Sequence, residues 1–178
     1  MRFNKKEYLI VDGYNIINSW DELKELSKTD LEHAREKLID AIIEYAEYTG
    51  RKGIIVFDAY NVKNSLEKVE NRKYITVVYT KEHQTADSYI EKFITSLSKY
   101  DVVKVATNDY AEQQIVLGKG ASRISSRELK MDLEEAKNKI RKKQSNTGGK
   151  IQRNWLEDRL DKETLSKLEN IRRNRWKY

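Results

Sequence analysis

The sequence predicts an α/β fold, a parallel-sheet sandwich with helices on both faces. Short apolar runs rich in Ile, Val and Tyr alternate with longer stretches whose apolar residues recur at helical spacing. Strands that alternate with helices usually form a parallel sheet, because each crossover helix packs back onto the sheet. A second observation is that the C-terminal end is much more basic than the rest of the chain. We therefore expect an α/β domain at residues 1–144 and a basic helical extension at residues 145–178.

Four short apolar segments are the basis of the strand prediction. They cover residues 7–12, 53–58, 74–80 and 101–107, and residues 121–124 could add a short edge strand. The segment 59–73, between the second and third strands, is polar and rich in Asn and Lys. We expect it to be a connection with at most one helical turn.

Helices are predicted where apolar residues recur every three or four positions. The first covers about residues 30–49, with Thr29 and Glu32 placed to form a capping box and Gly50 placed as the C-cap. Its apolar stripe consists of Leu31, Ala34, Leu38, Ala41, Ile42 and Tyr45. Further helices are expected at about residues 85–98 and 109–117, and a long one, capped by Ser125 and Glu128, is expected to run to about residue 143.

The C-terminal end differs from the rest of the chain in charge. Residues 1–136 contain 21 Lys and Arg against 24 Asp and Glu, a net charge of −3, whereas residues 137–178 contain 14 against 5, a net charge of +9. Such a basic end favours binding to a polyanion, although a solvated, charged helix would have the same composition. Residues 145–150 are typical of a flexible joint, and a final amphipathic helix or pair of helices is expected after them.

The composition excludes several classes of protein. The chain has no Cys, which excludes disulfides, thiol nucleophiles and zinc clusters built from Cys. No apolar stretch approaches the roughly 20 residues of a membrane span. The N-terminal sequence does not have the form of a secretory signal. We expect a protein of the reducing cytoplasm without a membrane partner.

Acidic residues follow the predicted strands. Asp12, Asp58 and Asp109 stand at or just after the ends of three of them. The carboxyl ends of parallel strands meet at one edge of a sheet, and ligands bind there, near the point where the strand order reverses. Asp87 and Glu91 share one face at the start of a predicted helix. These carboxylates would meet at mutual electrostatic cost, for which a divalent cation is the usual compensation.

Each acid also has an ordinary structural explanation. Asp12 precedes a glycine and could form a turn, and Asp87 could stabilise the N-terminus of its helix. Asp109 could cap the helix that follows it, unless Asn108 takes that role, and Asp58 could be a solvated strand end. The evidence for a site is therefore the joint arrangement of the acids at one edge.

The donor atoms favour a hard metal ion. Carboxylate oxygens dominate, Asn15 adds an amide oxygen near Asp12, and the chain has only two His. Mg²⁺ or Mn²⁺ fits such a set better than zinc or copper. Such an ion activates water and neutralises the charge that develops on a phosphodiester. Lys81 is the alternative partner for the pair of Asp87 and Glu91.

Other phosphate chemistries have little support in the sequence. There is no GxxxxGK[ST] phosphate loop and no GxGxxG after the first strand. His33 falls on a predicted helix surface and His83 in a loop, so a pair of histidines acting without metal is also poorly supported.

Four motifs, in this order along the chain, resemble the NYN domains of the PIN-like metal-dependent ribonucleases. They are Val11-Asp12-Gly13-Tyr14-Asn15, Phe57-Asp58-Ala59, Thr85-Ala86-Asp87 with Ile90-Glu91, and Ala106-Thr107-Asn108-Asp109-Tyr110. Two later stretches, Gly120-Ala121-Ser122-Arg123 and Ser125-Ser126-Arg127-Glu128-Leu129, resemble the YacP-like bacterial branch. The resemblance covers about residues 7–130, and the motifs are specific as a set.

The resemblance implies a five-stranded parallel sheet and endonucleolytic cleavage of RNA that needs Mg²⁺ or Mn²⁺. It implies that Asp12, Asp87 and Asp109 hold or orient the ion and that Asn15 belongs to the same centre. We expect Asp58 and Glu91 to support them. The resemblance also implies action on mRNA that is being translated, with the ribosome as partner; we expect no DNA substrate.

Basic residues are the candidates for holding RNA. Near the site these are Lys81, Arg123 and Arg127, with a salt bridge of either arginine to Glu128 or Asp132 as the alternative. At the C-terminal end they are Lys142, Lys143, Arg172, Arg173 and Arg175, and Trp176 could stack on a base. The predicted function is a cytoplasmic, metal-dependent endoribonuclease. The alternatives are a non-catalytic RNA- or ribosome-binding module with the same fold and a protein-interaction adaptor that uses the C-terminal helix.

Overall fold

The computed structural model describes residues 5–58, 66–109, 118 and 120–154, with the backbone alone for residues 144–154. By its internal contacts the chain divides into two compact units, Met1–Lys137 and Asn138–Tyr178. The elements are β1 (Glu7–Asp12), α1 (Gly13–Ser19), α2 (Asp21–Thr29), α3 (Leu31–Thr49), β2 (Lys52–Phe57), β3 (Lys68–Arg72), β4 (Ile75–Tyr79), α4 (Ala86–Ser96), β5 (Val102–Ala106), β6 (Ser122–Ile124) and α6 (Ser126–Asn154). The predicted division at residue 144 stays a prediction.

The strands form one six-stranded sheet in the order β3-β4-β2-β1-β5-β6. Five strands are parallel, as predicted, and β3 pairs with β4 in the antiparallel direction. The prediction of a simple connection at residues 59–73 is therefore wrong for Lys68–Arg72. The side chains of β3 are mostly charged and exposed, because β3 is an edge strand and needs no apolar run.

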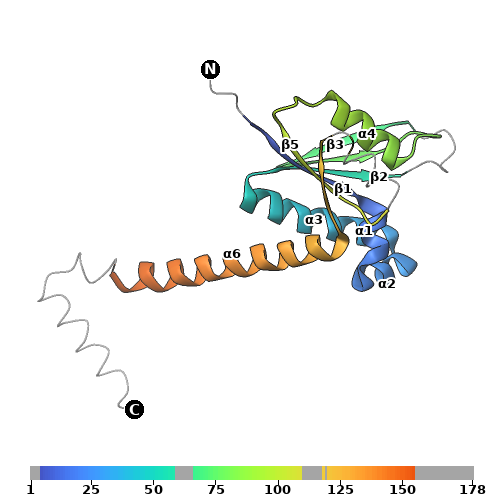
Figure 1. The fold of residues 1–178 in the computed structure, drawn as a ribbon. Coiled ribbons are helices and arrows are strands. Elements are labelled where there is room, and N and C mark those ends of the chain that lie inside the picture. The colour runs from blue at the N-terminus through green and yellow to red at the C-terminus, as the bar shows by residue number, and fades with distance from the viewer. Residues whose placement is uncertain (1–4, 59–65, 110–117, 119, 155–178) are drawn as a thin grey trace, which may run out of the picture. The chain divides into compact units, whose positions relative to one another are not determined.

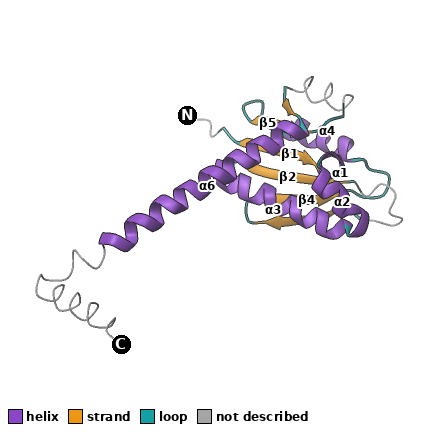
Figure 2. Ribbon diagram, turned by 90° about the horizontal axis from the view of Figure 1, so that it is seen from below, coloured by secondary structure: helices purple, strands orange, loops and turns teal. Residues whose placement is uncertain are grey.

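Helices cover both faces of the sheet, so the predicted fold class is confirmed. In Figure 1, α4 lies on one side of the sheet and α1, α2 and α3 lie on the other. Figure 2, seen from the side of α3, shows these three helices in front of the strands. One core lies between the sheet and α1–α3 and includes Leu9, Ile55 and Phe57; the other lies under α4 and includes Ile10, Val56 and Ile90.

Two short helices at the N-terminal side were not expected from the sequence, and they change one predicted cap. Asp30, and not Thr29, is the N-cap of α3, and its carboxylate accepts a hydrogen bond from the backbone N–H of His33 at 2.9 Å. Thr29 instead ends α2, where its hydroxyl donates to the carbonyl of Leu26. The predicted C-cap is confirmed, because Gly50 has a φ of 71°.

The apolar stripe of α3 is largely as predicted. Ala34, Leu38, Ile42 and Tyr45 are buried and Ala41 is partly buried; Ile39 and Ala46, which are not in the predicted stripe, are buried as well. Leu31 is 41% exposed, so its place in the stripe is wrong. The reason is its position as the first residue of the helix, directly after the cap.

The last described helix begins as predicted and ends later. Ser125 and Glu128 form the capping box: the hydroxyl of Ser125 accepts from the N–H of Glu128 at 3.2 Å, and the carboxylate of Glu128 accepts from the N–H of Ser125 at 2.8 Å. The backbone stays helical to Asn154, so the joint predicted at residues 145–150 is wrong. The helices predicted at residues 109–117 and after residue 154 lie outside the described residues. In the described part of the chain, no helix is long and apolar enough to cross a membrane.

Candidate active site

Four aspartates stand at the carboxyl edge of the sheet. Asp12 is the last residue of β1, and Asp58 comes directly after β2. Asp109 follows β5 by three residues, and Asp87 lies in the first turn of α4, after β4. The strand order reverses between β1 and β5, because the chain builds β2 and β4 on one side of β1 and then crosses to the other. This is where doubly wound sheets bind their ligands.

Asp12 has a strongly perturbed ionisation. Its carboxylate caps α1 and accepts a hydrogen bond from the backbone N–H of Asn15 at 3.2 Å. Burial raises the pKa of Asp12 from 3.8 to about 6. The hydrogen bond from Asn15 opposes this rise, and the negative charges of Asp87, Asp58 and Asp109 add to it.

Asp87 responds to the same charges. Partial burial raises the pKa of Asp87, and the charges of Asp109 and Asp58 raise it further. The charges of Asp58 and Asp109 therefore reach both Asp12 and Asp87, although the four residues are up to 97 positions apart in the sequence. Glu91 lies one turn further along α4 and is half-buried. Its role at the site stays a prediction.

A close packing contact fixes the start of α1 next to Asp12. A Cβ added at Gly13 would lie 2.3 Å from the Phe57 ring, which is fully buried, so this position has no room for a side chain. Tyr14 packs on Phe57 with ring centroids 5.2 Å apart, and Phe57 stacks on Tyr79 at 5.4 Å. No loop separates β1 from α1, and these contacts pack the point where they join against the ends of β2 and β4.

Asn108 joins the ends of three elements at the same edge. Its backbone N–H donates to the side-chain oxygen of Asn15 at 3.0 Å. Its side-chain amide donates to the hydroxyls of Ser19 and Ser126 at 2.9 and 2.7 Å. Its side-chain oxygen accepts from the N–H of Ser126 at 3.0 Å, at the start of α6. The sequence suggests Asn108 as a possible cap of the next helix. It gives no sign of the contact with α6, because Ser126 is distant in the sequence.

The predicted RNA-binding residues are only partly described. Arg123 is exposed, and its Nε donates to the carbonyl of Thr107 at 3.2 Å, two residues before Asp109. Lys81, Arg127, Lys142 and Lys143 are exposed as well. Glu128 accepts hydrogen bonds from the N–H and hydroxyl of Ser125, and the nearby charge of Arg123 helps to lower its pKa. Arg172, Arg173, Arg175 and Trp176 lie outside the described residues.

The acids fit a hard divalent ion in their chemistry. They are oxygen donors whose charges help to raise the pKa of Asp12 and Asp87, and a cation between them would remove that cost. In the described ranges, no three carboxylates or histidines are close enough to form a ready-made metal site. The four aspartates thus share one electrostatic environment without converging on a single point.

Comparisons with known proteins agree with this fold. A model of the YacP-like NYN domain matches residues 9–173. The protein YacP of Bacillus subtilis (strain 168) is 43% identical over 138 residues, which cover 77% of this chain and 81% of that protein. The chain belongs to the YacP-like NYN domain family, as the sequence motifs predict.

Two crystal structures of Rae1 (YacP) from Bacillus subtilis are similar to this chain. One, of a single-residue mutant, has a TM-score of 0.71 at 37% identity and matches 82% of this chain and 86% of its own. The other has a TM-score of 0.69 at 39% identity and matches 93% of this chain and 94% of its own. Together with the motifs, membership of this family suggests a nuclease, and hence a nucleic-acid substrate.

Proposed function

We propose that this protein is a metal-dependent endoribonuclease that cleaves mRNA. The observation that carries the proposal is the raised pKa of Asp12, to which burial and the charges of three other aspartates contribute. Such a cluster of carboxylates, at the point where the strand order reverses, is typical of a catalytic site. Membership of the YacP-like NYN family supports the same function.

The acids divide into two roles in this proposal. Asp12, Asp87 and Asp109 would hold Mg²⁺ or Mn²⁺, and Asp58 and Glu91 would support them from the neighbouring elements. A bound ion would supply an activated water and charge neutralisation at the scissile phosphate. Asn15 accepts a hydrogen bond from Asn108 in the segment after β5, and in this proposal that bond would keep Asp109 near Asp12.

Arg123 would hold the RNA backbone at the site. Its hydrogen bond to the carbonyl of Thr107 anchors an exposed guanidinium next to the loop that carries Asp109. Arginine recognises phosphate with several N–H donors in a fixed geometry, so it can position a strand without reading its sequence. Arg127 and Lys81 would extend this contact, and the basic C-terminal residues, including Lys142 and Lys143, would add sequence-independent affinity.

The proposed substrate is mRNA in the process of translation, with the ribosome as partner, in the cytoplasm. This finer assignment is based on the resemblance of the motifs to their family and on the basic C-terminal end, which could bind ribosomal RNA. The alternative is a non-catalytic RNA- or ribosome-binding module with the same fold. It requires that RNA is bound and left intact at every Mg²⁺ or Mn²⁺ concentration.

The test is a comparison of wild type, Asp87→Asn and Asp40→Asn on RNA, with and without translating ribosomes. Asp40 is an exposed residue of α3 without a described contact, so Asp40→Asn removes the same charge away from the site. Wild type and Asp40→Asn should cut RNA only with Mg²⁺ or Mn²⁺, and Asp87→Asn should not cut. A folded Asp87→Asn protein with full activity would contradict the proposal.

A further inference from the structure

A second surface, lined by aromatic and cationic side chains, lies at the edge of the sheet opposite the four aspartates. It is a groove of about 590 Å³ at the amino ends of β1, β2 and β4, on the side covered by α4. Four aromatic rings line it: Tyr8, Tyr74, Tyr89 and Phe93. Four cationic residues line it as well: Arg51, Lys52, Arg72 and Lys73. No Asp or Glu is among its described lining residues, so the charged residues that line the groove are all basic, whereas those at the other edge are acidic.

The register of the strands explains how rings and cations interleave. Tyr8 of β1 pairs with Lys52 of β2, and Gly53 of β2 pairs with Ile75 of β4, so Tyr74 lies across from Lys52 on its other side. The backbone of Lys52 therefore lies between Tyr8 of β1 and Tyr74 of the turn before β4. Tyr89 and Phe93 line the groove on the side of α4. The ring of Phe93 is edge-on to that of Tyr8, with centroids 6.0 Å apart.

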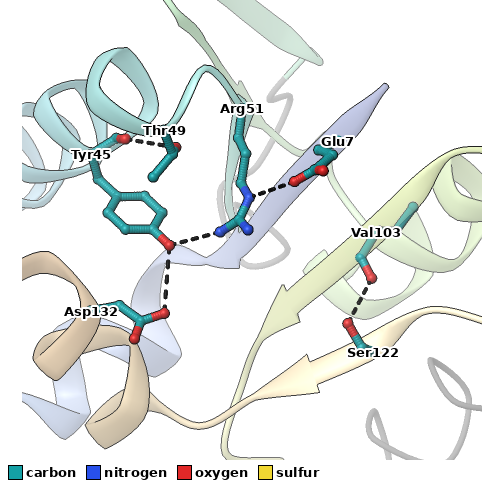
Figure 3. Close-up of polar contacts among 7 residues, drawn as sticks. All are labelled: Glu7, Tyr45, Thr49, Arg51, Val103, Ser122 and Asp132. Carbon is teal, nitrogen blue, oxygen red and sulfur yellow. Dashed lines mark hydrogen bonds and ion pairs between the residues drawn. The ribbon is translucent and has the colours of Figure 1, made fainter. Parts of the chain in front are cut away.

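The other three cations are held by carboxylates that do not line the groove. Arg51 donates to Glu7 at 3.0 Å and to the hydroxyl of Tyr45 at 2.8 Å, as Figure 3 shows. Lys73 pairs with Glu47 at 3.0 Å. Arg72 binds Glu36 and Glu70 through its guanidinium. These contacts keep the rim of the groove in place.

Lys52 and Tyr74 are the parts of the groove that can meet a ligand. Lys52 is exposed, and its side chain has no ion pair or hydrogen bond among the described residues. Tyr74 is 40% exposed, in the two-residue turn between β3 and β4, with the ammonium of Lys73 5.0 Å from its ring centroid. Tyr74 thus offers an exposed face for stacking, and Lys52 offers an unpaired cation for a phosphate contact.

We propose that this groove binds the unpaired bases of a single-stranded segment of RNA. Tyr74, the exposed ring, would stack on a base, and Lys52 would pair with a phosphate, which are the contacts that single-stranded RNA uses without sequence readout. An acidic peptide would use the cations and leave the rings without a function. The inference depends on the proposed function in one respect, because the bound strand would be the substrate of the acidic edge.

The length of the strands sets the geometry of this second site. β2 has six residues and separates the groove from the acidic edge. Six residues of a strand span about 20 Å. A strand of RNA long enough to cross this distance would therefore contact both sites, whereas a dinucleotide would contact only one. The groove would raise the affinity for long substrates without touching the reacting phosphate.

The test uses the full chain and a pair of matched double variants. Lys73→Ala with Tyr74→Ala removes a cation and a ring from the groove. Lys99→Ala with Tyr100→Ala removes the same pair from a loop outside it, where the ammonium of Lys99 lies 5.2 Å from the ring centroid of Tyr100. Tyr100 is 49% exposed, so the two pairs are comparable in exposure. A third variant, Lys52→Gln, changes the unpaired cation alone.

Binding of an unstructured RNA of about 15 nucleotides, a length within the usual range of single-strand sites, is measured by fluorescence anisotropy in EDTA. The groove pair should weaken binding about tenfold or more, and the control pair should not. Lys52→Gln should also lower the salt dependence by about 0.7 in the log–log slope. Circular dichroism melting curves confirm that each variant is folded. Equal affinity of both double variants and wild type, or an equal loss in both double variants, would overturn the proposal.

The outcome is separable from that of the proposed function. Binding in EDTA needs no cleavage, so the groove can be confirmed even if the protein does not cut RNA. If it does cut, the groove variants should raise KM on the long RNA with kcat unchanged, and Asp87→Asn should abolish turnover with binding unchanged. A groove variant that lowers kcat alone would contradict a binding role.

Discussion

The side-chain oxygen of Asn15 accepts a hydrogen bond from the backbone N–H of Asn108 at 3.0 Å, and so joins α1 to the segment after β5. Asn15 lies three residues after Asp12, and Asn108 comes directly before Asp109. The bond therefore spans the two strands between which the order of the sheet reverses. It holds together the two parts of the chain that carry Asp12 and Asp109.

Replacement of Asn15 by Ala should therefore lower activity more than stability. The lost hydrogen bond is partly exposed, so we expect a cost of about 1 kcal/mol in the free energy of unfolding. Displacement of Asp109 should lower kcat by about tenfold or more, because small shifts of catalytic groups are costly. Urea denaturation and initial cleavage rates measure the two effects. Asn18→Ala, at an exposed position of α1, is the control, and equal kcat values for the two variants would contradict this role.

The raised pKa of Asp12 predicts that the metal-free protein is more stable in mild acid than at neutral pH. Above about pH 6 the buried carboxylate is ionised, which destabilises the folded state; as the pH falls from about 6 toward 3.8, folded Asp12 takes up a proton before the unfolded chain does. The contribution amounts to about 2–3 kcal/mol at most. Urea denaturation in EDTA across this pH range measures it.

Asp12→Asn is the matching variant for that pH dependence. The amide keeps an oxygen that can accept from the N–H of Asn15 and carries no charge. In EDTA at pH 8 it should be more stable than wild type, by about 1–3 kcal/mol, and its stability should vary less between pH 4 and 7. A variant that is less stable than wild type at pH 8 would show that the charge of Asp12 carries no cost.

Mg²⁺ or Mn²⁺ should stabilise the wild-type protein and not the Asp12→Asn variant. An ion that binds only the folded state raises the free energy of unfolding by about 2.7 kcal/mol at a concentration of 100 times its Kd. Thermal melting with increasing Mn²⁺ gives the effect, and Asp40→Asn serves as the control because it removes an exposed carboxylate of α3. The same rise in Tm for all three proteins would place the ion elsewhere.

Gly13→Ala should disrupt the packing beside the site. The added Cβ would lie 2.3 Å from the buried ring of Phe57, so the ring or α1 must move. We expect a loss of about 1–3 kcal/mol in stability, as for other overpacked positions. Gly118→Ala is the matched control, because a Cβ there has nothing within 4 Å. Chemical denaturation of both variants tests the prediction, and equal stabilities would contradict it.

The strands were predictable because buried parallel strands leave apolar runs in the sequence. The residues of β2 after Lys52 are all buried, and β1 is buried from Tyr8 to Val11. β3 was not predictable, because Lys68, Glu70 and Arg72 give it no apolar pattern; it forms through its turn and its pairing with β4. The first helix was hidden because Gly13 and Asn15 are more typical of a turn than of a helix.

The site was predictable only in its broad placement. Parallel strands end at one edge, so the position of Asp12, Asp58 and Asp109 after their strands was enough to place them together. The role of Asn108 was not predictable, because its partners Ser19 and Ser126 are distant in sequence and ordinary in type. The groove at the other edge was not predictable for a similar reason: Tyr8, Lys52 and Tyr74 are brought near one another only by the pairing of β1, β2 and β4.

The most direct measurement of the central claim is anomalous diffraction from crystals of the wild-type protein soaked in Mn²⁺. We expect a peak at the carboxyl edge of the sheet, within about 2–2.5 Å of carboxylate oxygens from Asp12, Asp87 and Asp109. The same soak of Asp87→Asn crystals should lose the peak. Anomalous peaks for Mn²⁺ elsewhere in the wild-type crystal, with no peak at these aspartates, would contradict the proposed metal site.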